Sequence, residues 1–372
     1  MTIPMARPST GAAELKQIKE VFKSGWLGEG HITEMFEKAL GEFTGARHVV
    51  AVNTGTSALH LALHGLGVGP GDEVILPSMT FVSDPQAVLM CGAQPVFCDI
   101  DENTLNVTPE TIKKHLTAKT RAIIPTDFAG LPCDVRAIRR AVGHPGIKII
   151  RDASHSFGSR INGKILGIRS GEDATCFSFD PIKNLTCGEG GAILVKNATM
   201  ASRLRSQKML GIIRSTWYSF SKKKVEDRRV VQQGFRYHMS NINAAIGLAQ
   251  LQQFESFATQ RKKLAALYDD LLQGHPGIKL FKRDYEAIVP FMYIIRVAPH
   301  NRDNLINFLV ANDAHAGLRY FPCHLQPFFE HSGASLPATE HVAQEMLSIP
   351  LYHGMRTSQA RRIAALIKKF FN

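Results

Sequence analysis

The feature that most constrains this chain is a regular alternation of short apolar runs with helical patterns between residues 48 and 151. Strands that alternate with helices predict a mostly parallel sheet covered by helices on both faces. Ligands of such sheets bind beyond the carboxyl ends of the strands, so the residues that follow each run are candidates for a site. The apolar runs, in chain order, read HVVAVN, EVILP, PVFCDI, RAIIPT and KIIRDA.

A second unit is predicted after this sheet. Residues 241–272 read as one long helix that leads away from it, and a strand pattern, IVPFMYIIRVA, and a helical pattern, NRDNLINFLVAND, follow. We therefore expect an α/β chain of two domains. The large one covers residues 1–254 and includes an N-terminal helical segment, and a smaller α/β domain covers residues 255–372.

Composition limits the setting in which the protein works. No run approaches the roughly 18 apolar residues that span a bilayer, and the first residues lack the basic-then-apolar pattern of a secretory signal. The six cysteines form no Cys-x-x-Cys pair, which predicts reduced thiols in the cytoplasm. The chain shows no zinc-ligand spacing and no aromatic RNA-binding motif. We therefore expect a cytoplasmic protein without a metal, a membrane partner or a nucleic-acid partner.

The net charge of +12 is concentrated in one segment. Residues 201–229 carry nine Lys or Arg and two Asp or Glu. Two interpretations stay open from the sequence. The segment is a solvated basic loop, or it attracts a phosphorylated ligand.

The first candidate site follows the run HVVAVN. Gly55 and Thr56 come directly after it and open a helical pattern. The first turn of a helix presents unpaired N–H groups and positive dipole charge, and glycine lets an anion approach the backbone, so this position suits a phosphate. A simple helix cap by Thr54 or Thr56 explains the same residues equally well.

The second and third candidates follow two later runs. Asp152 and His155 come after KIIRDA, where a carboxylate is costly unless it pairs with a cation. A helix-capping aspartate is the alternative. Ser178 ends the run before SFDPIKNLTCGEGG, in which Pro181 and several glycines form a tight turn around Lys183. A desolvated lysine favours the neutral, nucleophilic amine that forms Schiff bases with aldehydes.

These groups match the needs of one cofactor. A phosphate cup, a buried aspartate and a neutral lysine at neighbouring strand ends are the partners of pyridoxal phosphate (PLP). The lysine binds its aldehyde, the aspartate keeps its pyridine nitrogen protonated, and the cup holds its phosphate.

Longer motifs add a family resemblance over nearly the whole chain. The sequence resembles the sugar aminotransferases of the DegT/DnrJ/EryC1/StrS family, a branch of the fold-type I PLP enzymes. This resemblance implies a large domain with a mostly parallel mixed sheet between helices, followed by a smaller C-terminal α/β domain. The motifs that carry it are SGWLGEG, NTGTSALHLAL, GDEVILPSMTFVSDPQAV, GAQPVFCDID, DASHS, FSFDPIKNLTCGEGG, GFRYHMSNINAAIGLAQL and IPLYHG.

The resemblance implies a role for each matching residue. Lys183 matches the catalytic Schiff-base lysine and Asp152 the partner of the pyridine nitrogen. His155 stands beside the position of the ring's phenolic oxygen, and Phe81 matches the aromatic residue that stacks on the ring. The residues that match the phosphate cup are Gly55, Thr56 and Ser178.

The same resemblance implies a homodimer with shared active sites. In the family, a residue of the motif GFRYHMSN closes the phosphate cup of the second subunit, which makes Arg236 and His238 candidates for cofactor binding. Tyr320 and His324, in the motif LRYFPCH, are candidates for binding the sugar, although a core role is equally open for each.

Several positions depart from the family pattern. Asn is frequent where Arg236 stands, Arg or Asn where His238 stands, Glu where Arg151 stands, and His where Asp127 stands. His or Tyr is frequent at Asp180. These departures concern the substrate and not the cofactor, since Arg236 remains a competent phosphate ligand.

The resemblance implies a function in amino-sugar biosynthesis, for instance for O-antigen polysaccharide. The expected reaction converts a keto-deoxy-sugar nucleotide to the amino-sugar nucleotide, with glutamate as amino donor. The motifs GFRYHMSNINAAIGLAQL and GLPCD look closest to perosamine-type synthases, which favours carbon-4. Two alternatives remain: a sugar-nucleotide 3-dehydratase, whose family members carry His at the Lys183 position, and a non-catalytic PLP-binding regulator.

Overall fold

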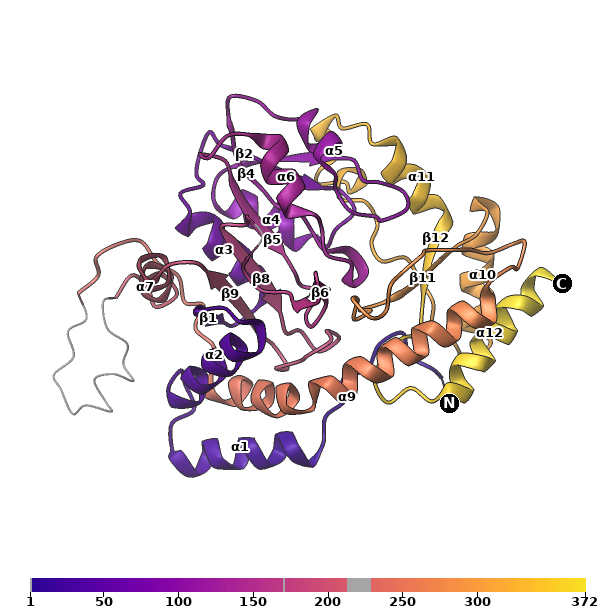
Figure 1. The fold of residues 1–372 in the computed structure, drawn as a ribbon, viewed down its shortest axis with the longest axis horizontal. Helices are drawn as coiled ribbons and strands as arrows, with labels where there is room; N and C mark the ends of the chain where they lie inside the picture. Colours follow the sequence, from indigo (N-terminus) through magenta and orange to yellow (C-terminus); the bar gives the residue numbers. More distant parts are fainter. Residues whose placement is uncertain (1, 170, 213–228) are drawn as a thin grey trace.

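The computed structural model describes residues 2–169, 171–212 and 229–372, and its largest element is a seven-stranded sheet (Figure 1). The pairs β1–β9 and β8–β9 are antiparallel and the other neighbours are parallel, which confirms the predicted mostly parallel sheet. In spatial order the strands are β1 (His48–Val52), β9 (Gly191–Val195), β8 (Ala174–Ser178), β5 (Lys148–Asp152), β4 (Thr120–Ile123), β2 (Glu73–Pro77) and β3 (Gln94–Cys98).

Helices cover both faces of this sheet because its strands bury side chains on both sides. In β1, Val50 and Val52 join the apolar core under α3, α4 and α7, whereas Val49 and Ala51 join the core under α2 and α9. Helices α5 and α6 pack on the same face as α2. The helices of this part are α1 (Ala12–Ser24), α2 (His31–Thr44), α3 (Gly55–Gly65), α4 (Ser83–Met90), α5 (Pro109–Lys113), α6 (Val135–Val142), α7 (Ala198–Gln207) and α9 (Asn241–Leu272).

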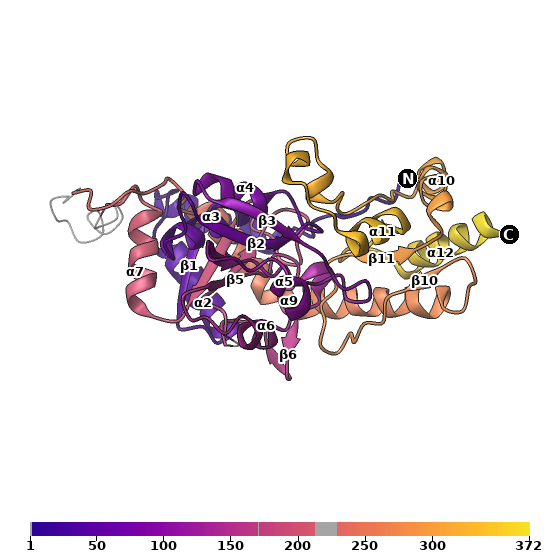
Figure 2. The ribbon, with the colours of Figure 1, turned by 90° about the horizontal axis from the view of Figure 1, so that it is seen from above.

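A smaller antiparallel sheet lies at the other end of the molecule, where both chain termini also lie (Figures 1 and 2). Its core also contains Ile3, which pairs with Ala314 across an isolated bridge. A separate short hairpin joins β6 (Arg160–Ile161) to β7 (Lys164–Ile165). The remaining elements are β10 (Lys279–Leu280), β11 (Tyr293–Arg296), β12 (Met346–Ile349), α10 (Pro299–Ala311), α11 (Pro337–Glu345) and α12 (Thr357–Phe371).

Helix α9 connects the two cores. Its 32 residues extend over about 48 Å. Phe254 and Ala258 pack in the core of the large sheet, and Leu264 and Leu272 pack in the core of the small one. The division predicted between residues 254 and 255 therefore falls inside a continuous helix and stays a prediction. Among the described residues, no helix is both long and apolar enough to cross a membrane.

The sheet brings the predicted strand ends to one edge. Strand β1 runs in the same direction as β8, because both are antiparallel to β9. The carboxyl ends of β1, β8 and β5 therefore meet. Asp152 ends β5, Ser178 ends β8, and helix α3 begins three residues beyond the end of β1.

Candidate active site

A cavity of about 210 Å³ opens at this edge of the large sheet. Most of the site residues predicted from the sequence line it. They come from the carboxyl ends of β1, β2, β5 and β8, or the chain just beyond them, and from the segment between α10 and α11. The predicted residues that line it are Gly55, Thr56, Phe81, Asp152, His155, Ser178, Lys183 and Tyr320.

One end of the cavity is formed by the start of helix α3. Thr54 caps the helix, since its side chain accepts a hydrogen bond from the backbone N–H of Ser57 at 3.0 Å. The first-turn N–H groups of Gly55 and Thr56 have no acceptor inside the helix. A Cβ atom at Gly55 would lie only 2.7 Å from the Cβ of Ser178, so only glycine lets the helix begin this close to β8. The cap and the anion site are therefore compatible.

Lys183 lies in the turn between β8 and β9. Asp180 shapes this turn, because its carbonyl oxygen accepts from the Lys183 N–H at 3.0 Å and its side chain accepts from the Ile182 N–H at 3.0 Å. The lysine is half-buried because it borders the cavity, while its Nζ lies 4.5 Å from the centre of the Phe291 ring. Desolvation lowers the pKa of Lys183 to about 8, against the opposing effect of Asp152. The neutral amine is therefore accessible near neutral pH.

Asp152 is buried beside this amine. Its Oδ1 accepts hydrogen bonds from the N–H of Ser154 at 2.9 Å and from the Ser154 hydroxyl at 2.5 Å. Burial raises the pKa of Asp152, and the Ser154 bonds and Lys183 oppose that rise. In the described chain the residues after Asp152 form turns and not a helix, so helix capping does not explain this carboxylate.

His155 forms the inner wall together with two aromatic rings. Its ring lies flat against Phe291, with centroids 4.4 Å apart, and its Nε2 lies 3.3 Å from the hydroxyl of Tyr320. Burial lowers the pKa of His155 well below its usual value, and Lys183 adds to the effect. The neutral ring keeps a buried Nδ1 that has no hydrogen-bond partner among the described residues. Phe81 is 49% exposed and borders the cavity, and the centre of its ring lies 5.4 Å from the centre of the Tyr320 ring.

Three predicted site residues do not line this cavity. Arg236 is exposed, and its backbone pairs with Met209. His238 is half-buried, and burial lowers its pKa although Glu29 opposes the shift. A role of Arg236 and His238 in the cup of a second subunit stays a prediction. His324 is buried in the interior.

His324 is 3% exposed and bonds through both ring nitrogens. Its Nδ1 lies 2.6 Å from the hydroxyl of Ser78, and its Nε2 lies 3.2 Å from a carboxylate oxygen of Glu340. His324 therefore has the core role that the sequence left open for it. Tyr320, its predicted companion, does reach the cavity.

Comparisons with known proteins agree with this geometry. The model of the DegT/DnrJ/EryC1/StrS aminotransferase family matches residues 8–368. The chain belongs to this family.

Solved structures of related proteins cover the whole fold of this aminotransferase. The aminotransferase TlmJ from Streptoalloteichus hindustanus is 31% identical over 100% of this chain and 99% of its own, with a TM-score of 0.91. DesV of S. venezuelae, solved with a ketimine intermediate, is 32% identical over 96% of this chain and 94% of its own, with a TM-score of 0.88. Spr1654 of Streptococcus pneumoniae, described as a sugar aminotransferase and solved in a PLP form, is 26% identical over 100% and 98%, with a TM-score of 0.91.

This aminotransferase is a PLP-dependent enzyme, and its cavity fits the cofactor. The donors at the start of α3 and Ser178 suit a phosphate, and the buried Asp152 suits a protonated ring nitrogen. The unpartnered Nδ1 of His155 is a polar atom that needs a partner from a bound group. Lys183 supplies the amine that binds the aldehyde.

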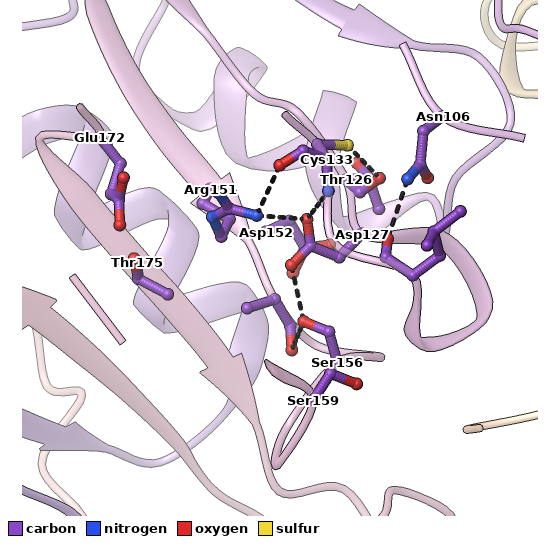
Figure 3. A network of polar contacts seen from close by, with 12 residues as sticks. Asn106, Thr126, Asp127, Cys133, Arg151, Asp152, Ser156, Ser159, Glu172 and Thr175 are labelled. Atoms are coloured by element: carbon purple, nitrogen blue, oxygen red, sulfur yellow. Dashed lines mark hydrogen bonds and ion pairs between the residues drawn. The ribbon is translucent and has the colours of Figure 1, made fainter. Parts of the chain in front are cut away.

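Behind Asp152, two of the departures from the family pattern form one contact (Figure 3). The guanidinium of Arg151 lies 2.8 Å from the carboxylate of Asp127, and both side chains are fully buried. Asp127 also accepts from the N–H of Cys133 at 2.8 Å and from the hydroxyl of Ser156 at 2.7 Å. Burial alone would lower the pKa of Arg151, but Asp127 and Glu172 raise it. Burial raises the pKa of Asp127, and the guanidinium of Arg151, which keeps its proton, is the largest of the effects that oppose this rise.

Sequence reasoning missed three residues around the cavity. Phe291 belongs to the segment before β11, and nothing in its local pattern indicates a contact with Lys183. Arg319 lies close enough to Lys183 and His155 to lower the pKa of both. Asp84 had a detectable signal, because it is the one carboxylate in the stretch SMTFVSDPQAVLMCG, but a charge at a helix start reads as an ordinary first-turn residue.

Proposed function

We propose that this aminotransferase converts a nucleotide-linked keto-deoxy-sugar to the corresponding amino sugar, with nitrogen entering at carbon-4 and glutamate as the amino donor. The single observation that carries the proposal is the Lys183 amine. It lies beside the carboxylate of Asp152, at the mouth of the cup that α3 and Ser178 form. Family membership supports a sugar as the acceptor.

Four residues of the cavity have a defined role in this reaction. PLP, when bound, supplies an electron sink for the carbanion that forms when a proton leaves the substrate carbon. Lys183, with a pKa near 8, takes that proton as a neutral amine and delivers it again as an ammonium. Asp152 holds the proton of the ring nitrogen, and neutral His155 offers Nδ1 as a hydrogen-bonding group toward the cofactor. The exposed face of Phe81 supports the ring by stacking.

The size of the cavity supports an extended substrate. Its volume of about 210 Å³ is smaller than the roughly 300–1,000 Å³ of pockets that enclose a drug-sized ligand. A nucleotide sugar therefore extends beyond the walls that one chain provides. The basic segment 201–229 supports recognition of its diphosphate, although its residues 213–228, including Lys222, Lys223 and Lys224, lie outside the described residues.

The amino donor in the proposal is an anion. Arg319 places a guanidinium 5.9 Å from the centre of the Phe291 ring, over which Lys183 also lies. Arg319 is half-buried, and its guanidinium lowers the pKa of Lys183. A positive group next to the amine supports a dicarboxylic donor such as glutamate.

The proposal includes a cytoplasmic homodimer. The six cysteines are free and buried, as expected of a protein in a reducing compartment. Arg236, exposed at the start of the segment that leads into α9, would reach the cup of the partner. Mixing two inactive variants, Lys183→Ala and Arg236→Glu, should restore activity, because a mixed dimer then holds one site without either change. Confirmed mixed dimers without activity would contradict shared sites.

One assay tests the reaction itself. The PLP-loaded enzyme is given glutamate and a set of nucleotide-linked keto-sugars with the keto group at carbon-3 or carbon-4, and the products are identified by mass spectrometry and NMR. We expect 2-oxoglutarate and a 4-amino sugar in equal amounts, and neither with Lys183→Ala. A 3-amino product overturns the position. Loss of a hydroxyl without gain of nitrogen would indicate a dehydratase. The absence of turnover with every sugar tested would indicate a regulator.

A further inference from the structure

A second buried carboxyl group lies directly beside Asp152. Asp84, in the first turn of α4, is fully buried. One of its oxygens, Oδ2, accepts from the Thr80 hydroxyl at 2.7 Å and from the Thr126 hydroxyl at 2.9 Å. The two side chains lie close enough that each shifts the pKa of the other, and the effect of Asp84 on Asp152 is that of a hydrogen bond. Thr126 holds the two elements together, because its backbone pairs with Asp152 while its side chain bonds Asp84.

Two carboxyl groups in this contact cannot both be ionised without a large cost. Like charges at hydrogen-bonding distance repel strongly where water is excluded. Asp152 is the better anion, because it has two donors from Ser154 and lies near the Lys183 amine. Asp84 has hydroxyl donors on Oδ2 and only a distant one, the Ser83 hydroxyl at 3.3 Å, on Oδ1. Burial, and then Asp152, raise the pKa of Asp84 well above its usual value.

We propose that Asp84 is a neutral carboxylic acid that donates its proton in a hydrogen bond to Asp152, and that it thereby positions the carboxylate that receives the cofactor's ring nitrogen. The pair then carries one negative charge, located on Asp152, which matches the single positive charge of a protonated ring nitrogen. Asp84 acts through Asp152 and is a positioning residue. The inference is independent of which sugar is the substrate.

The neutral form of Asp84 also matters for Lys183. A negative Asp84 raises the pKa of Lys183, as Asp152 already does. An ionised pair would therefore hold the lysine as an ammonium and oppose the neutral amine that binds the aldehyde. The titratable groups that face Asp84 from the surrounding elements are Asp152, Lys183, Cys176, Tyr320 and Cys323.

The first experiment asks whether Asp84 holds a proton. Infrared spectra of the cofactor-free protein at neutral pH should show the C=O stretch of a buried carboxylic acid. Asp84→Asn should remove this band. Asp127→Asn is the matched control, because it makes the same chemical change at a carboxylate that faces a guanidinium, and it should leave the band in place. A band that survives in Asp84→Asn, or that never appears in the wild type, overturns the proposal.

The second experiment measures PLP affinity by titration of the cofactor-free protein. Asparagine keeps the shape and a hydrogen-bond donor without charge, so Asp84→Asn should bind PLP within about threefold of the wild type. Asp84→Leu keeps the bulk but not the donor, and it should bind at least about tenfold more weakly, as expected for a lost hydrogen bond to a charged group. Circular dichroism establishes that each variant is folded.

Two results of the titration count against the proposal. Equal affinity of folded Asp84→Leu and wild type would show that Asp84 does not position Asp152. A change of more than about tenfold in Asp84→Asn would show that a negative charge at residue 84 takes part in binding. Because both measurements use the protein and PLP alone, they remain valid even if no sugar substrate is turned over.

Discussion

Two buried aspartates flank Asp152, and they differ in what faces them. Asp127 lies opposite the guanidinium of Arg151 at 2.8 Å (Figure 3), and neither residue lines the cavity. Asp84 lies opposite another carboxyl group, that of Asp152, which lines the cavity. Both are fully buried and both accept two or more hydrogen bonds.

The difference separates a structural charge from a functional one. A buried carboxylate with a fixed cation has its partner before any ligand binds. Removal of either partner lowers the stability of the folded protein. A buried carboxyl pair without its own cation is satisfied in full only when a positive group binds. Strongly shifted titratable groups of this second kind mark functional sites. In this enzyme the two kinds are close neighbours: Asp127 lies beyond the end of β4, Asp152 ends β5, and Asp84 lies in the first turn of α4.

The largest expected effect lies on the functional side. Lys183→Ala removes the amine that faces the carboxyl pair, and transamination should fall by at least about 10³-fold. The cofactor-free variant should be no less stable than the wild type, since a desolvated lysine is removed. Rates are measured in single turnover. Borohydride reduction should attach PLP covalently to the wild type alone, which the mass of the intact protein shows. A variant with the wild-type rate would contradict the anchor role of Lys183.

The next largest effect lies on the structural side. Arg151→Met leaves Asp127 buried without a cation, and the free energy of unfolding should fall by about 3–5 kcal/mol. Urea unfolding of the cofactor-free protein measures it. Adding Asp127→Asn should recover more than half of the loss, because the uncompensated charge is then gone. If the double variant is as unstable as the sum of the two single ones, the contact between the residues carries little energy.

A smaller effect is expected at the residue between the two sides. Asp152→Asn keeps the shape but cannot hold the ring nitrogen's proton as a counter-ion. A hydrogen bond to a charged group contributes roughly 1.5–3 kcal/mol, so PLP should bind at least about tenfold more weakly and turnover should fall. Titration with PLP and steady-state rates check this. Near-normal turnover with saturating PLP would show that Asp152 has only a structural function.

The smallest effect is a pH dependence that should appear at Asp84. Its pKa in the folded protein lies above that of the unfolded chain. The folded state therefore keeps a proton that the unfolded state releases, and the contribution of Asp84 to the stability of the wild type falls as pH rises above about 4. Asparagine cannot ionise, so the stability of Asp84→Asn relative to the wild type should increase from pH 4 to pH 7. Urea midpoints at both pH values measure it, and a constant difference would contradict a raised pKa.

The sequence predicted those parts of the site that depend on local order. Asp152, Ser178 and Gly55 follow apolar runs, and parallel strands bring such positions to one edge of a sheet. Lys183 was detectable because it is the single lysine in a glycine-rich turn. Together with Asp152 and the phosphate cup, this lysine already indicated PLP. The family resemblance then supplied the roles of Phe81 and His155, and both residues line the cavity.

Contacts between distant segments could not be predicted in the same way. Arg151 and Asp127 each attracted attention as a departure, but only the packing of β4 against β5 shows that they are partners. The pair of Asp84 and Asp152 depends on how α4 enters the sheet, and the place of Phe291 depends on the docking of the small domain. His324 carries a polar ring in a motif near the site, yet the bonds to Ser78 and Glu340 hold it in the interior.

The polar cavity also bears on the life of the protein in the cell. Lys183, Asp152 and the unpartnered His155 nitrogen are desolvated groups of this cavity, and a bound cofactor would satisfy them. A ligand that binds only the native state stabilises it by about 2.7 kcal/mol at one hundred times its dissociation constant. Newly made chains that lack PLP should therefore be the ones that proteases remove first. The supply of PLP in the cell would then set the abundance of this enzyme as well as its activity.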